Sequence, residues 1–140
     1  MKTISRLIPF VFILTFCCGK SFSQTKNSQA YFIRSLNYVG SVVPFKLYID
    51  DVLVCKLKNN KYSVHDLSPG AHTFAVQNTG LSSHRKSIPL KINVEENKTV
   101  YLTVVNGSSL YLQEVTQASA DMLIKKTVQV KDCQTGSKDK

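Results

Sequence analysis

The side chains with the most chemistry to offer are histidines and cysteines, which are common ligands of zinc. The chain of 140 residues contains His65, His72 and His84, and two cysteines beyond its N-terminal region, Cys55 and Cys133. Their spacings match no ligand signature such as C-x-x-C or H-x-x-x-H. We therefore expect no metal and no cofactor. The alternative is a small secreted hydrolase or metal-dependent enzyme that uses one of the three histidines.

Adjacent carboxylates are the second chemical pattern, and they occur as Asp50-Asp51 and Glu95-Glu96. Successive residues of a strand point to opposite faces, so neither pair is arranged as an acid–base dyad, and both are typical of turns. The sequence also lacks the Gly-x-Ser-x-Gly motif of a serine nucleophile. These patterns predict a protein that is not an enzyme and has no catalytic residue.

Tyrosines offer a different kind of site, because an exposed aromatic surface can bind a glycan or a peptide. Tyr48 and Tyr101 are expected on the outward faces of strands and are the candidate binding residues. Ordinary pairing with neighbours across a sheet is the alternative role for both.

These residues lie in segments where apolar and polar side chains alternate, which is typical of half-buried strands. The pattern predicts strands over residues 30–37, 45–49 and 52–58, the last with Leu53, Cys55 and Leu57 on one face. Residues rich in turn propensity separate the strands. The predicted turns are Asp50-Asp51, Asn59-Asn60, Leu67-Ser68-Pro69-Gly70, Glu95-Glu96-Asn97-Lys98 and Asn106-Gly107.

The second half of the chain continues the alternation over residues 87–94 and 100–104. Pro89 cannot donate a ladder hydrogen bond, so the first of these strands lies at an edge or begins beyond Pro89. Ser119 is placed to cap a short helix that runs through Lys126. Short strands at this spacing predict an all-β protein, an immunoglobulin- or prealbumin-like β-sandwich of about seven short antiparallel strands with a short C-terminal helix. An open barrel is the alternative.

The N-terminal region reads as a signal peptide over residues 1–23. A basic start precedes the apolar run Leu7 to Cys18, and Ser21-Phe22-Ser23 is a small-x-small cleavage pattern. This run is shorter than the roughly 20 residues that span a bilayer, and no later segment reaches that length, so we expect no transmembrane segment in the mature chain. Cleavage before Cys17 or Cys18, which would add a lipid anchor, is the alternative. The domain boundaries that follow are a flexible leader at 24–29, the β-sandwich at 30–131 and a disordered tail at 132–140.

This reading places the protein outside the cytoplasm, either periplasmic or secreted, with an outer-membrane lipoprotein as the alternative. Loss of Lys2, Arg6 and Lys20 with the signal peptide lowers the formal charge from +9 to +6. The remaining basic residues are dispersed, and they favour weak attraction to acidic glycans or lipid head groups. Nucleic acid is not expected as a partner. An oxidising compartment would permit a disulfide between Cys55 and Cys133, whereas the alternative is a buried Cys55 and a free thiol in the tail.

Two runs, YIDDVLVCKLKNNKYSVHDLSPGAHTF and KINVEENKTVYLTV, resemble the bacterial family called domain of unknown function 2846 and, more loosely, PEGA-type surface modules. Asp51, Cys55 and Asn97 stand where that pattern has glycine, but Asp and Asn can adopt the same backbone conformations. The resemblance implies an exported β-sandwich of the cell envelope without an assigned reaction. We therefore predict a binding or structural role toward an envelope protein or glycan. The matching positions are Tyr48, Asp50, Leu57, Tyr62, Leu67, Pro69, Gly70, His72, Lys98, Thr99 and Tyr101.

Overall fold

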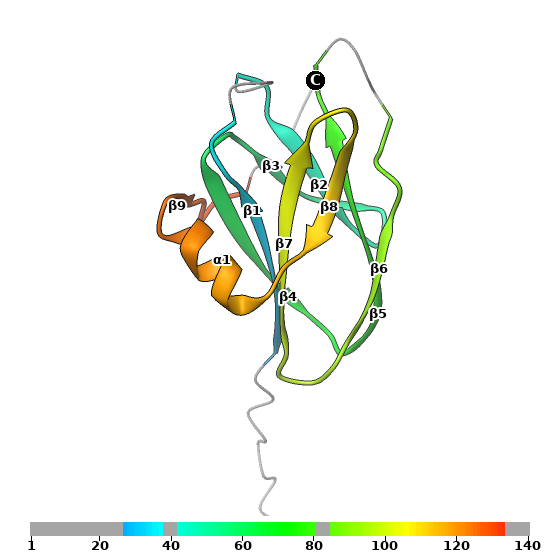
Figure 1. The fold of residues 1–140 in the computed structure, drawn as a ribbon. Coiled ribbons are helices and arrows are strands. Elements are labelled where there is room, and N and C mark those ends of the chain that lie inside the picture. Colours follow the sequence, from blue (N-terminus) through cyan, green and yellow to red (C-terminus); the bar gives the residue numbers. More distant parts are fainter. Residues whose placement is uncertain (1–26, 38–41, 81–84, 134–140) are drawn as a thin grey trace, which may run out of the picture.

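Two β-sheets and one short helix make up the computed structural model, which describes residues 27–37, 42–80 and 85–133 (Figure 1). The predicted signal peptide, His84 and residues 134–140 lie outside these ranges. In order across the first sheet, the strands are β8 (Leu110–Glu114), β7 (Thr99–Asn106), β1 (Ser28–Arg34), β4 (Lys61–Leu67) and β9 (Val128–Gln129). In order across the second, they are β3 (Val52–Leu57), β2 (Phe45–Ile49), β5 (Gly70–Asn78) and β6 (Leu90–Val94).

The interior lies between the two sheets, and both contribute alternate side chains to it. Phe32 of the five-stranded sheet contacts Phe74 of the four-stranded sheet edge to face, with ring centroids 6.0 Å apart. Both phenylalanines are fully buried. This two-layer arrangement confirms the prediction of an all-β, sandwich-like fold with a short C-terminal helix. The main buried residues from both sheets are Ala30, Phe32, Phe45, Leu47, Cys55, Leu57, Phe74, Val76, Val100 and Leu102.

Strand number and direction differ from the prediction of about seven antiparallel strands. The described residues form nine strands, and two of the pairings, β1 with β7 and β4 with β9, are parallel. Strands that pair in parallel are joined by long connections, so the local alternation of apolar and polar residues does not predict parallel pairing. The first strand also begins at Ser28, inside the predicted leader at 24–29. Ser28 is buried there, and its hydroxyl donates to the Glu95 carbonyl at 2.8 Å.

The backbone conformation at three of the turns agrees with the turns predicted from the sequence. Among residues 27–37, 42–80 and 85–133, four residues other than glycine have positive φ, and they lie in three of the predicted turns: Asp50 (48°), Asp51 (64°), Asn60 (57°) and Asn97 (58°). Gly70, with φ of 132°, begins β5 directly after Pro69. Asp and Asn tolerate this region better than other side chains, which explains how Asp51 and Asn97 form turns without glycine.

A β-bulge changes the predicted side-chain pattern of β3. Leu47 pairs with Cys55, but the next residue, Tyr48, pairs with Leu53, so Val54 is the extra residue. Leu53 therefore lies opposite the outward Tyr48. The alternation had predicted that Leu53 shares a face with Cys55 and Leu57, and the bulge makes this prediction wrong. Cys55 and Leu57 on one side of the bulge are fully buried, whereas Val52 on the other side, opposite Ile49, is 64% exposed.

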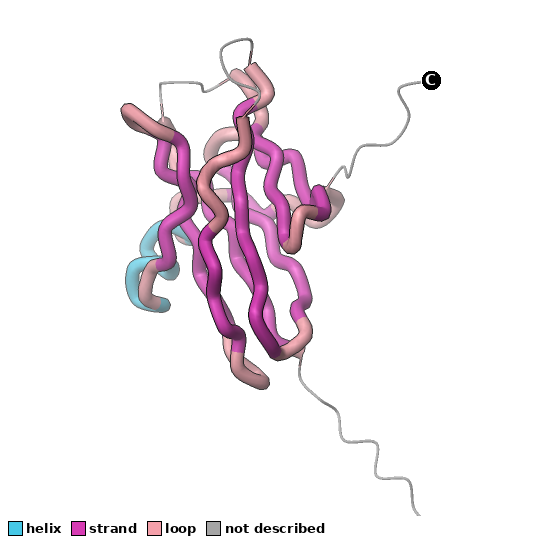
Figure 2. Tube along the Cα trace, turned by 90° about the vertical axis from the view of Figure 1, so that its right-hand side faces the viewer, coloured by secondary structure: helices cyan, strands magenta, loops and turns pink. Residues whose placement is uncertain are grey.

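The helix α1 (Gln117–Ile124) begins three residues earlier than predicted. Thr116 is its N-cap and accepts a hydrogen bond from the Ser119 backbone N–H at 3.4 Å, so Ser119 lies inside the first turn. The helix packs on β1 and β7 over the outer side of their sheet, as Figures 1 and 2 show. Ala120 and Ile33 are fully buried between helix and sheet. In the described part of the chain, no helix has the length and apolar character needed to cross a membrane.

Candidate functional site

A disulfide joins Cys55 of β3 to Cys133, which follows β9, with 4.7 Å between the two Cα atoms. Cys55 is fully buried in the core, whereas Cys133 is partly exposed. The bond connects positions 78 residues apart and attaches the segment after β9 to the edge of the four-stranded sheet. Asp132 therefore belongs to a described segment, although the sequence placed it in the disordered tail.

His65 lies next to this disulfide. One ligand atom from each of Cys55, His65 and Cys133 falls within 4.8 Å of the others. The rings of His65 and Phe32 make a T-shaped contact with centroids 5.6 Å apart, and His65 Nε2 is 3.1 Å from Ser63 Oγ. Burial lowers the pKa of His65, which favours the neutral imidazole. The sequence spacing of 10 and 78 residues matches no ligand motif, so only the fold brings the three side chains together.

His72 is held between two turns. Its Nδ1 lies 2.6 Å from Asp50 Oδ2, and its Nε2 lies 2.8 Å from the backbone carbonyl oxygen of Ser68. The other oxygen of Asp50 accepts from the backbone N–H of Thr73 at 2.8 Å. This arrangement ties the β2–β3 turn to the β4–β5 turn.

Asp50, His72 and Ser68 are the residue types of a serine hydrolase triad, but their geometry does not prepare a nucleophile. Both ring nitrogens of His72 face acceptors, an arrangement that raises the pKa of His72 and favours the protonated ring, in which both N–H groups donate. Ser68 Oγ is 3.5 Å from Nε2, farther than the carbonyl oxygen that already accepts from that nitrogen. A general base needs a lone pair directed at the hydroxyl, whereas Nε2 is directed at the closer Ser68 carbonyl oxygen, which can only accept. The group therefore acts as a structural clamp.

This clamp predicts a pH-dependent stability. The hydrogen bond with Asp50 raises the pKa of His72, and the Thr73 backbone N–H lowers the pKa of Asp50. The contribution of His72 to the free energy of unfolding is complete below the pKa of about 6.5 that histidine has in the unfolded chain. It is lost as the pH rises through the raised pKa of His72 in the folded protein. The aspartate contribution is complete above about 3.8 and is lost as the pH falls through the lowered folded value.

We therefore expect wild-type protein to lose roughly 0.5–1 kcal/mol of this stabilisation between about pH 5 and about pH 9, a small figure because water screens the half-exposed Asp50. Urea unfolding at both pH values would measure the difference, with His72→Gln as the comparison. The variant should show a smaller decline with pH than the wild type. An equal decline in both proteins would contradict the role of His72.

The two candidate tyrosines lie on different sheets, so the structure does not bring them together into one binding surface. Tyr48 of β2 donates to Gln77 Oε1 at 2.6 Å, and Lys86 Nζ lies 4.1 Å from its ring centre. Tyr101 of β7 is next to Tyr31 of β1, with ring centres 5.1 Å apart. Both tyrosines therefore make the cross-strand contacts that the sequence left as the alternative role.

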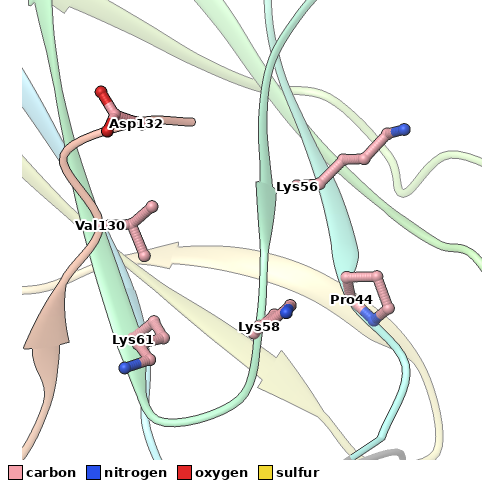
Figure 3. Close-up of a pocket in the computed structure, with 6 residues that line it drawn as sticks. All are labelled: Pro44, Lys56, Lys58, Lys61, Val130 and Asp132. Carbon is pink, nitrogen blue, oxygen red and sulfur yellow. The ribbon is translucent and has the colours of Figure 1, made fainter. Parts of the chain in front are cut away.

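An open cavity of about 260 Å³ lies beside the disulfide, between the β3–β4 hairpin and the segment after β9 (Figure 3). We call it the lysine cavity. It collects three lysines from β3, the following loop and the start of β4, none of which forms an ion pair with a described residue. One carboxylate and two apolar side chains complete it. The lining residues are Pro44, Lys56, Lys58, Lys61, Val130 and Asp132.

In the sequence these lysines belong to the dispersed positive charge, and no pattern predicts a site for them. Lys56, Lys58 and Lys61 are close in sequence, but Val130 and Asp132 come from the other end of the domain. The tight turn at Asn60 and the attachment of the C-terminal segment through Cys133 bring both walls together. An excess of positive charge around a concave opening favours an anionic ligand.

Two comparisons with known proteins gave no match. No protein-family model matches the chain, and a search of the curated proteins finds no match. The resemblance to domain of unknown function 2846 therefore stays a prediction, and only the residues and their geometry bear on function.

Proposed function

We propose that this protein is an exported, non-catalytic β-sandwich module of the cell envelope that binds an acidic saccharide in the lysine cavity. The observation that carries the proposal is that Lys56, Lys58 and Lys61 all line one concave opening. The proposal is also supported by the features that suit an extracytoplasmic protein and by the chemistry of the cavity walls.

Export is supported by the signal-like N-terminal pattern and by the disulfide. Disulfides persist in oxidising compartments and are rare in the cytosol. The bond between Cys55 and Cys133 is consistent with folding outside the cytoplasm. Cleavage before Cys17 or Cys18 would make the same domain a lipoprotein, with its cavity unchanged.

The cavity walls combine the groups that a sugar acid requires. Ammonium groups can donate to a carboxylate, and Asp132 can accept from hydroxyl groups. The apolar surfaces of Pro44 and Val130 provide contact for the C–H face of a pyranose ring. A volume of about 260 Å³ is at the small end for a ligand pocket, which favours one or two sugar units over an extended polymer.

Substitution of all three lysines tests the proposal. We expect Lys56→Ser/Lys58→Ser/Lys61→Ser to weaken binding of a galacturonic acid oligosaccharide by roughly tenfold or more, because three screened charge contacts of about 0.5–1 kcal/mol each are lost. Isothermal titration calorimetry would measure affinity at low salt. The corresponding galactose oligosaccharide, which lacks the carboxylates, should bind more weakly to the wild type.

A matched control removes the same charge elsewhere. Lys91, Lys125 and Lys126 are exposed and lie outside the lysine cavity, so their triple serine variant should retain most of the affinity. Equal weakening in both triple variants would mean that net charge alone attracts the ligand, and the cavity would be rejected as its site. Failure of wild-type protein to distinguish the acidic from the neutral oligosaccharide would reject the ligand class.

A further inference from the structure

We propose that Cys55, His65 and Cys133 form a Zn²⁺ site when their disulfide is reduced, so that the metal ion replaces the covalent bond as the link between β3 and the C-terminal segment. Zinc binds two thiolates and an imidazole readily, and a fourth position can be filled by water. This inference does not depend on the saccharide site, since it uses other side chains and another ligand.

The ligand atoms already have the spacing that a metal site needs. Zinc–sulfur and zinc–nitrogen bonds of about 2.3 and 2.0 Å place tetrahedral ligands about 3.5–3.8 Å from one another. All three atoms of this cluster lie within 4.8 Å of one another. On reduction, the two sulfurs need only separate to non-bonded contact, while the histidine ring moves slightly toward them.

The strands restrict the ring and one sulfur before any metal binds. His65 pairs with Ala30 in the β1–β4 ladder and points into the sandwich, toward the sheet that contains Cys55. The contact with Phe32 and the hydrogen bond between Nε2 and Ser63 Oγ limit rotation of the imidazole. Hydrogen bonds of this kind orient metal-ligating histidines in known sites. Most of the adjustment then falls to Cys133, which is partly exposed.

Reduction requires a partner, for which we specify a protein dithiol. One of its thiolates attacks the partly exposed Sγ of Cys133, because Cys55 is fully buried, and Cys55 leaves as a thiolate. The second thiol of the partner loses a proton and resolves the mixed disulfide, which releases Cys133. The partner is thereby oxidised to a disulfide and the cluster is reduced to two thiols. Binding of Zn²⁺ then displaces two protons from those thiols.

Cobalt titration of the full mature chain tests the site, because Co²⁺ substitutes for zinc and gives a visible sulfur-to-metal charge-transfer band. We expect reduced protein under anaerobic conditions to bind one Co²⁺, and added Zn²⁺ to abolish the band by displacement. Oxidised protein should show no band. Failure of the reduced protein to develop the band would overturn the proposal.

His65→Gln separates a three-ligand site from adventitious binding to two thiols. The variant keeps the disulfide, so thermal unfolding of its oxidised form establishes that it folds. We expect it to bind Co²⁺ at least about tenfold more weakly, since loss of even a partner of a ligand costs about 10–100-fold. His84→Gln is the matched control, and it should bind as the wild type does. Equal affinity of His65→Gln and wild type would show that the histidine is no ligand.

Discussion

Replacement of Cys133 by alanine is expected to lower the free energy of unfolding by about 4 kcal/mol. The disulfide closes a loop between positions 78 residues apart, and such a bond stabilises mainly by limiting the conformations of the unfolded chain. Cys133 is the better position to change, because Cys55 is part of the core and its replacement would add a packing defect. The C-terminal segment carries α1 and β9, so these elements should lose order first.

Urea unfolding followed by circular dichroism would measure this effect. Reductant should shift the wild-type midpoint toward that of the variant, and it should leave Cys133→Ala unchanged. A variant as stable as oxidised wild type would mean that the bond makes no contribution to the folded state. Because Asp132 and Val130 form one wall of the lysine cavity, the variant should also bind the acidic oligosaccharide less tightly.

Replacement of Arg34 by alanine should cost about 3 kcal/mol or more, the second large effect. Arg34 is only 2% exposed, and its Nη1 donates to the carbonyl oxygens of Val43 and Leu57, each at 2.9 Å. Its guanidinium carbon lies 3.7 Å from the centre of the Phe45 ring. Burial lowers the pKa of Arg34 to about 10. Alanine would leave a void and two carbonyls without these donors, and each such loss is costly inside a protein.

Thermal and urea unfolding of three variants would separate the contributions. Arg34→Lys keeps a positive charge but not the planar fork that reaches two carbonyls and stacks on a ring, so it should recover only part of the loss. Arg85→Ala is the control, because Arg85 is exposed and its removal should change stability by less than about 0.5 kcal/mol. A loss as small in Arg34→Ala as in Arg85→Ala would contradict the role of the buried guanidinium.

Much of the architecture could be predicted from local pattern. Alternation identified β2, β3 and β7, and turn-forming residues placed the bends at Asp50-Asp51, Asn60 and Asn97. Both signals depend on nearest neighbours, because side chains of a strand alternate with a period of two and positive φ is a property of single residues. The start of β6 at Leu90, directly after Pro89, follows from the missing N–H of proline.

Relations between distant segments could not be predicted in this way. The parallel pairing of β1 with β7 and the bulge at Val54 depend on which strands pair with one another. The local periodicity of apolar residues does not predict those pairs. Tyr48 and Tyr101 looked equivalent as outward strand residues, yet they belong to different sheets. A role in binding for either tyrosine stays a prediction.

By itself, the sequence determined the all-β class, most turns and the two cysteines available for a bond, because these follow from residue type and short-range spacing. Tertiary structure decided which side chains share a site. It placed His65 beside Cys55 and Cys133, made His72 a clamp on Asp50, and set Val130 and Asp132 opposite three lysines. The physical reason is that a binding site is a relation between chain segments, and only the burial of a common core brings distant segments to fixed positions.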